Sequence, residues 1–119
     1  MQNFRNLKVW ERAHVLALDI YKTSESFPRE ERYGLTSQMR RAAISIGSNI
    51  AEGACRRGDP DFARFLQIAF GSASELEYQC LLAADLQLMN PQDYHRLDGE
   101  AREVKRMLAA LLQRLRAES

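Results

Sequence analysis

The stretch that decides the fold is residues 61–89, which read DFARFLQIAFGSASELEYQCLLAADLQLM. Apolar or small residues recur in it at steps of three and four, which draws one stripe along a helix. The stripe consists of Phe62, Leu66, Ala69, Ala73, Leu76, Cys80 and Ala83. Further apolar residues fall off it, namely Ile68, Phe70, Tyr78, Leu81, Leu82, Leu86 and Leu88. Because a helix that is apolar on several sides has to be buried on several sides, this stretch predicts the central helix of a bundle that also packs against other copies of the chain.

Three other segments have the same helical periodicity. Together with the central stretch they predict helices over about 6–26, 36–57, 60–89 and 91–117. Thr36 or Ser37 is expected to cap the second helix. The pairs Asp59-Pro60 and Asn90-Pro91 have the residue types of an N-cap followed by a first helical residue. Loops this short place consecutive helices antiparallel, so the chain is predicted to be one all-α domain, an up-down-up-down four-helix bundle.

Charge and composition narrow the class of protein. The chain has 17 Lys and Arg against 16 Asp and Glu, a net charge of +1. Residues 28–58 nevertheless carry a net +3 and residues 59–90 a net −4. Near-neutrality weakens the case for strong nucleic-acid binding, which usually shows as a basic excess. No apolar run is long enough for a membrane span and no signal peptide opens the chain, so we expect a cytoplasmic protein without membrane contact. Cys55 and Cys80 then stay reduced.

The predicted second and third helices form a hairpin that turns near Gly58 and Asp59. Residues at the same level on the two helices then have numbers that sum to about 117. This register places Arg41 level with Glu75 or Leu76 and Arg40 level with Glu77, and it predicts inter-helix salt bridges among Arg40, Arg41, Glu75 and Glu77. Small residues meet at the same level, so the closest helix packing is predicted at Ala43, Gly47, Gly71 and Ser72.

Basic residues near the two ends of the second helix are the candidate nucleic-acid contacts. They are Arg56 and Arg57 at one end and Arg29 and Arg32 just before the other. As nucleic-acid contacts they would neutralise phosphates without reading sequence. As structural residues, Arg56 and Arg57 would instead pair with Asp59 and Asp61 in the hairpin loop. The sequence leaves both interpretations open.

Patterns typical of catalysis or metal binding are weak. Glu11 and His14 have the Glu-x-x-His spacing of half a di-iron site, but the only other histidine, His95, follows Gln92 at that spacing. A polar group formed by Ser45, Ser48, Asn49 and Glu52 has no histidine nearby to activate a serine, and no glycine-rich phosphate loop is present. We therefore expect no catalytic residue, no metal and no cofactor, and a protein that is not an enzyme.

The apolar residues outside the core stripes are the strongest functional signal. The oligomer-interface candidates are Ile44, Ile68, Phe70, Tyr78, Leu81 and Leu82. They predict a chain that binds itself, because a monomer of this size has little room to bury them all. The function expected is a non-enzymatic scaffold or binding module with possible RNA or DNA contact. The alternative is a protein–protein adaptor that binds no nucleic acid.

Phe27-Pro28 and then residues 33–53, YGLTSQMRRAAISIGSNIAEG, carry a family resemblance that continues through residues 64–69, 71–72 and 75–77. The run closely resembles the bacterial four-helix bundle proteins encoded in intervening sequences of 23S ribosomal RNA genes. The resemblance implies a cytosolic homo-oligomer, a ring of five bundles, with no established enzymatic activity. The bundle is also similar to accessory proteins of diversity-generating retroelements, which bind nucleic acid and a reverse transcriptase through a basic pentameric surface. This chain departs from those proteins in its near-neutral charge, and it has Gly47 where relatives often have proline.

Overall fold

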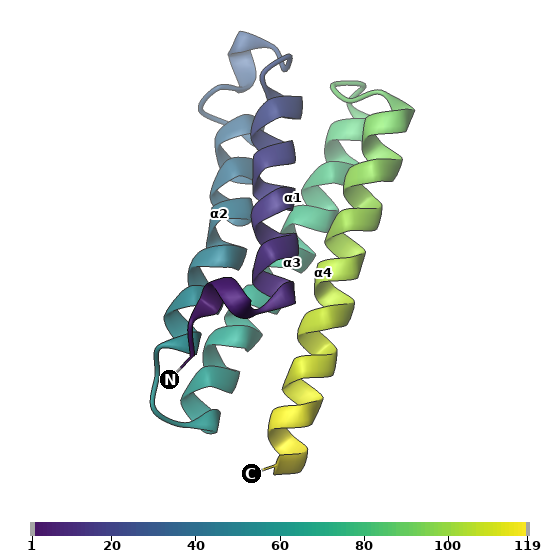
Figure 1. Cartoon of the computed structure of the whole chain (residues 1–119). Helices are drawn as coiled ribbons and strands as arrows, with labels where there is room; N and C mark the ends of the chain where they lie inside the picture. The colour runs from purple at the N-terminus through teal and green to yellow at the C-terminus, as the bar shows by residue number, and fades with distance from the viewer. Residues whose placement is uncertain (1, 119) are drawn as a thin grey trace.

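The structure is a computed structural model that describes residues 2–118. Its helices are α1 (Lys8–Ser24), α2 (Leu35–Ala54), α3 (Asp59–Asp85) and α4 (Pro91–Glu118), with short 3-10 helices η1 (Phe4–Asn6) and η2 (Arg29–Glu31). Each α-helix runs opposite to the one before it in an elongated bundle (Figure 1). The predicted all-α four-helix bundle is confirmed. No helix in the described part of the chain has the length and apolarity to cross a bilayer.

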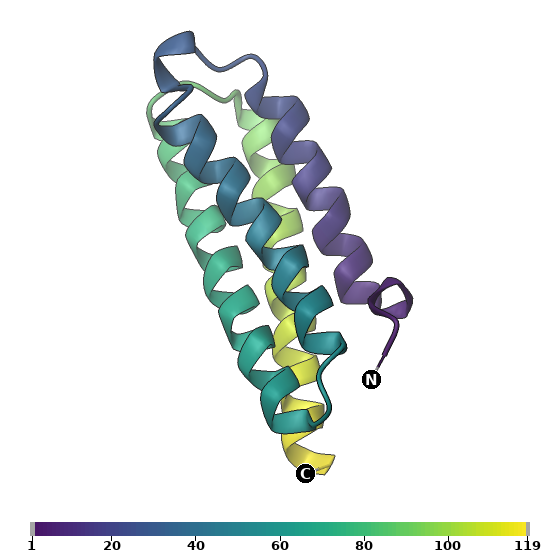
Figure 2. The ribbon, with the colours of Figure 1, turned by 90° about the vertical axis from the view of Figure 1, so that its left-hand side faces the viewer.

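All four helices contribute to one apolar core. α3 packs against both α2 and α4, and α1 packs against the same two helices on the other side (Figure 2). The predicted stripe of α3 is confirmed at every position, since Phe62, Leu66, Ala69, Ala73, Leu76, Cys80 and Ala83 are at most 4% exposed. Burial raises the pKa of the Cys80 thiol to about 12, so this thiol stays protonated. Cys55 is exposed, and both cysteines are free thiols.

The predicted third helix ends too late, because α3 stops at Asp85 rather than near residue 89. Gln87 has φ 63°, a left-handed conformation that ends a helix. The Leu88 N–H donates to the Ala83 carbonyl at 2.9 Å, and the Gln87 N–H donates to the Ala84 carbonyl at 3.0 Å. These two bonds form a Schellman cap, a geometry that usually needs glycine. The sequence has glutamine at this position, so the residue types did not indicate that the helix ends there.

The predicted helix starts are partly correct. Asn90 caps α4 as expected, because its Oδ1 accepts a hydrogen bond from the Asp93 N–H at 2.8 Å. Neither Thr36 nor Ser37 caps α2, which already begins at Leu35. There the Glu31 carboxylate reaches back and accepts from the Leu35 N–H at 3.2 Å. A side chain in the preceding turn has thus taken the role that was assigned to the helix's own first residues.

The predicted salt bridges between α2 and α3 are wrong. Arg40 turns toward α1, where it donates to the Ser24 hydroxyl at 2.9 Å and to the Tyr21 carbonyl at 3.1 Å. Glu77 turns toward α4 and pairs with Lys105 at 2.9 Å and with Arg102 at 3.6 Å. The register fixed only the level of each residue along the bundle axis. The angle around each helix decides which neighbour a side chain meets, and it sends these two charges to opposite sides.

Arg41 and Glu75, the other two members of the predicted salt bridges, are both exposed. Neither forms an ion pair with any residue between 2 and 118. Both side chains are therefore available to a partner.

The predicted site of closest packing is also corrected. Ala43 is fully buried, and the Ser45 and Ser72 hydroxyls are 2.8 Å apart at the level that the register gives. However, a Cβ atom on Gly47 would meet Trp10 of α1 at 3.6 Å, and one on Gly71 would meet nothing within 4 Å. The two glycines thus do not face each other across α2 and α3.

A close contact between α2 and α3 lies nearer the hairpin, at Gly53. A Cβ atom there would lie 2.8 Å from the Phe65 Cβ and 3.0 Å from the Phe62 Cδ1. The distance to the Phe65 Cβ is shorter than real Cβ contacts, and the distance to the Phe62 Cδ1 is shorter than nearly all of them. Glycine therefore lets the two helices approach this closely. The sequence analysis placed Gly53 at the end of a recognised run without assigning it this role.

Candidate functional site

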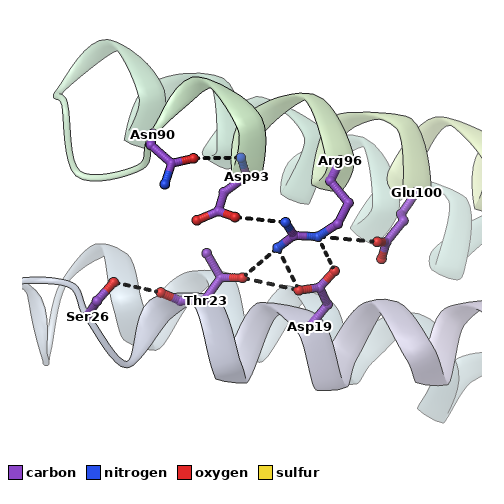
Figure 3. A network of polar contacts seen from close by, with 7 residues as sticks. All are labelled: Asp19, Thr23, Ser26, Asn90, Asp93, Arg96 and Glu100. Carbon is purple, nitrogen blue, oxygen red and sulfur yellow. Dashed lines mark hydrogen bonds and ion pairs between the residues drawn. The ribbon is translucent and has the colours of Figure 1, made fainter.

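A network of charged side chains joins α1 to the first turns of α4 (Figure 3). Arg96 lies at its centre and bonds both carboxylate oxygens of Asp19 at 2.9 Å. The same guanidinium donates to Asp93 at 2.7 Å and to the Thr23 hydroxyl at 3.1 Å. Glu100 lies one turn further along α4, with its Oε2 3.9 Å from the Arg96 Nε. One cation thus faces three carboxylates.

The carboxylates of this network differ in how well they are compensated. The hydrogen bonds from Arg96 hold the pKa of Asp19 below its usual value, although burial opposes the shift. Burial, together with the neighbouring Asp19 carboxyl, raises the pKa of Glu100 from 4.5 to about 7. The Glu100 Oε1 atom is buried without a hydrogen-bond partner. Glu100 is therefore the uncompensated member, and it holds a proton near neutral pH.

This arrangement is suited to joining two helices rather than to acting on a substrate. The oxygen atoms of Asp19 are used by Arg96 and by the Thr23 hydroxyl, which is 3.1 Å from the Asp19 Oδ1. Across residues 2–118, no group of three or more His, Cys, Asp or Glu side chains is placed to hold a metal ion. The network was not predicted, because Asp19 and Arg96 are 77 residues apart in the sequence. Only the docking of α1 against α4 brings them together.

The residues weighed for catalysis have structural surroundings. His14 stacks on Trp10, with ring centroids 5.0 Å apart and an interplanar angle of 8°. The Asn49 amide donates to the Ser45 carbonyl at 2.8 Å and to the Ser45 hydroxyl at 3.0 Å. That hydroxyl also bonds Ser72, so the polar group links α2 to α3.

The four candidate nucleic-acid contacts do not form one surface. Arg29 lies in η2 and Arg32 directly follows it, at the end of the bundle where α2 begins. Arg56 and Arg57 follow the last residue of α2, Ala54, at the opposite end. The 20 residues of α2 separate the pairs by about 30 Å. A basic patch made of all four side chains is therefore absent from this bundle.

Arg56 is already engaged within the chain. Its guanidinium pairs with Glu52 at 2.8 Å and approaches Asp61 at 3.8 Å. It also lies over the Phe65 ring, 4.8 Å from the centroid. The structural interpretation of Arg56 is thus the one that the geometry favours, including its predicted pairing with Asp61. Arg57 is exposed and forms no ion pair with the residues that the structure describes.

The predicted interface residues split into two groups. Ile44, Ile68, Tyr78 and Leu81 are 43–61% exposed, whereas Phe70 and Leu82 are half-buried. Lys105 covers Phe70, with its Nζ 5.2 Å from the ring centroid. Three exposed apolar side chains of α1 were not predicted, namely Val15, Leu18 and Tyr21, which are 39–58% exposed. Leu86, which the pattern placed off the core stripe, is 53% exposed. A helical wheel of α1 would have shown Val15 and Leu18 on its outer side.

Some of these side chains border a groove between α1 and α2, which we call the α1–α2 groove. Its volume is about 370 Å³ and its walls are mostly apolar. Trp10, Leu18 and Tyr21 of α1 face Ile44 and Gly47 of α2 across it. Apolar surface therefore lies on the outside of α1 and α2 as well as on α3.

Comparisons with known proteins agree with this fold. The family described as 23S rRNA-intervening sequence protein matches the chain over residues 5–110. The chain belongs to this family.

Among solved structures, the chain is similar to a protein of unknown function from the S23 ribosomal protein family of Bacteroides thetaiotaomicron. The two chains are 24% identical, the TM-score is 0.79, and the match covers 87% of this chain and 97% of the other. At this identity the likeness establishes the fold alone. No curated protein matches the chain.

Proposed function

We propose that this protein is a non-enzymatic scaffold that works as a homo-oligomer and binds protein rather than nucleic acid. The observation that supports the proposal is the apolar surface left outside the core, where Leu18, Ile44, Tyr78 and Leu81 are 43–61% exposed. Exposed apolar side chains that gather in a groove, as Leu18 and Ile44 do in the α1–α2 groove, are typical of a protein–protein interaction site. The family resemblance adds the expectation of a pentamer in the cytoplasm.

The first test is the mass of the purified chain in solution. Light scattering coupled to size exclusion is expected to give a multiple of the 13.7 kDa chain mass, because self-association removes the exposed side chains from water. Measurements over a tenfold concentration range separate a stable assembly from weak aggregation. A mass of 13.7 kDa at every concentration would overturn the proposal.

The second test separates an adaptor from a nucleic-acid scaffold. We expect no saturable binding of a generic single-stranded RNA in fluorescence anisotropy, even at 20 mM salt, a condition under which phosphate contacts are strongest. The physical reason is that the candidate arginines lie at opposite ends of the bundle and Arg56 is neutralised by Glu52.

Binding that weakens as salt rises would instead favour the nucleic-acid scaffold. The variant Arg57→Gln then provides the check on the site, because Arg57 is the exposed member of the pair that follows α2. An unchanged affinity in that variant would place the contact elsewhere.

A further inference from the structure

A groove runs between the start of α1 and the second half of α4, and we call it the α1–α4 groove. Its volume is about 660 Å³. Its apolar lining residues are Leu7, Val9, Met107, Ala110, Leu111 and Ala117. The charged residues that line it are Lys8, Arg106 and Arg114, and no carboxylate is among the lining residues. The groove is therefore apolar with a positively charged rim.

The groove exists because α1 is shorter than α4. Lys8 begins α1 at the level of Met107, and both residues line the groove. α4 continues to Glu118, about 16 Å further at the helical rise of 1.5 Å per residue. The chain before Lys8 turns away toward α2, where the Gln2 N–H donates to the Ala54 carbonyl at 2.8 Å. The end of α4 thus has no α1 beside it.

The outer side of α3 has apolar and acidic residues, which complement the apolar and basic residues of this groove. Glu75, Tyr78, Leu82 and Asp85 follow one another at steps of three, four and three, and we call this row the α3 outer face. Tyr78 is 61% exposed and Leu82 is half-buried between the two acidic residues. Neither Glu75 nor Asp85 forms an ion pair within residues 2–118. The row is an apolar ridge with an unneutralised carboxylate at each end.

We infer that the α3 outer face of one copy docks into the α1–α4 groove of the next copy. The inference rests on the proposed self-association and specifies which surfaces meet. Tyr78 and Leu82 then cover the apolar floor, while Glu75 and Asp85 meet Lys8 and Arg114. Lys8 and Arg114 are exposed and have no ion-pair partner in the described chain, whereas Arg106 already pairs with Glu103 at 2.7 Å. Two unpaired cations therefore face two unpaired anions.

Charge selects this groove over the α1–α2 groove. The residues that line the α1–α2 groove include no Lys, Arg, Asp or Glu, so that groove offers nothing to Glu75 and Asp85. The two docking surfaces lie on different helices of one bundle and cannot meet within a single copy. Their contact is head-to-tail, the kind that closes into a ring when the rotation between copies permits.

Charge reversal tests the pairing. The double variant Lys8→Glu/Arg114→Glu and the double variant Glu75→Lys/Asp85→Lys are each expected to weaken self-association at least about a hundredfold, because like charges then face each other. The quadruple variant restores opposite charges in inverted order, so it is expected to regain the mass of the unmodified chain. Light scattering measures the mass, and circular dichroism verifies that each variant keeps its helices.

The control is Arg29→Glu/Arg57→Glu, which changes the net charge by the same amount as the groove variant but lies outside the four α-helices. It is expected to keep the mass of the unmodified chain. An unmodified chain that is monomeric would overturn the proposed function and this inference together. An oligomeric chain whose two double variants keep their mass would overturn the pairing alone. Dissociation of both double variants without recovery in the quadruple variant would also overturn it, because the two surfaces would then not face each other.

Discussion

Replacing Gly53 with alanine is expected to lower the free energy of unfolding by about 1 kcal/mol. The new Cβ would lie 2.8 Å from the Phe65 Cβ and 3.4 Å from the Phe62 carbonyl oxygen, so α2 and α3 have to move apart. Overpacking of this kind costs about 1–3 kcal/mol, and it outweighs the gain of about 1 kcal/mol from replacing a helical glycine. Urea denaturation at one fixed protein concentration measures the difference, since assembly would make stability depend on concentration.

Gly99→Ala is the matched control for Gly53→Ala. Gly99 also lies within a helix, but a Cβ atom there would meet nothing within 4 Å. The same substitution is expected to raise the free energy of unfolding by about 0.5–1 kcal/mol, because only the conformational cost of glycine is removed. If both variants were stabilised, the close approach at Gly53 would not be a constraint on the fold.

Replacing Glu100 with glutamine is expected to stabilise the protein at pH 8 and to change its stability little at pH 4. The folded state raises the pKa of Glu100 from 4.5 to about 7. Between these values the folded chain keeps a proton that the unfolded chain has lost, so the contribution of Glu100 to stability falls as pH rises. Above pH 7 the glutamine variant has no buried carboxylate to ionise, so it does not lose this stability. One pKa unit corresponds to about 1.4 kcal/mol, and partial solvent exposure screens the charge, so we expect a gain of about 1–2 kcal/mol.

The measurement is the difference in free energy of unfolding between Glu100→Gln and the unmodified chain from pH 4 to pH 8. Glu103→Gln is the control, one turn away on α4. Arg106 holds the pKa of Glu103 below its usual value, so Glu103 contributes stability that is lost as pH falls. Glu103→Gln is therefore expected to lower the free energy of unfolding at pH 8, where Glu100→Gln raises it. A Glu100→Gln curve parallel to that of the unmodified chain would show that Glu100 titrates normally.

The network around Arg96 is also expected to lose stability at acidic pH. Arg96 lowers the pKa of Asp19 below 3.8, so the stability that Asp19 contributes is present above that pH and is lost as pH falls through the lowered value. Asp19 and Glu100 thus oppose each other in pH dependence. The Asp19 effect originates in the hydrogen bonds from Arg96, whereas the Glu100 effect originates in burial and in the neighbouring Asp19 carboxyl.

Local pattern was sufficient to predict the four α-helices and the buried stripe of α3. The stripe through Leu66, Ala73 and Cys80 is buried throughout, because residues spaced by three and four positions lie on the same side of a helix. Asn90 was predicted as a cap from the Asn90-Pro91 pair, and its side chain accepts a hydrogen bond from the Asp93 N–H three residues away. The end of α3 before Gln87 was not predicted, because the left-handed conformation of this residue is common for glycine and rare for glutamine.

The amino-acid sequence by itself determined the fold class, the number of helices, the α3 core stripe and the antiparallel hairpins, since these depend on residues within a few helical turns of one another. Only the tertiary structure decided which neighbour each charged side chain meets. Arg40 bonds α1, Glu77 bonds α4, and Asp19 bonds Arg96 across 77 residues. These partners depend on how each helix is rotated about its axis. That rotation results from packing the whole core, which no single segment encodes.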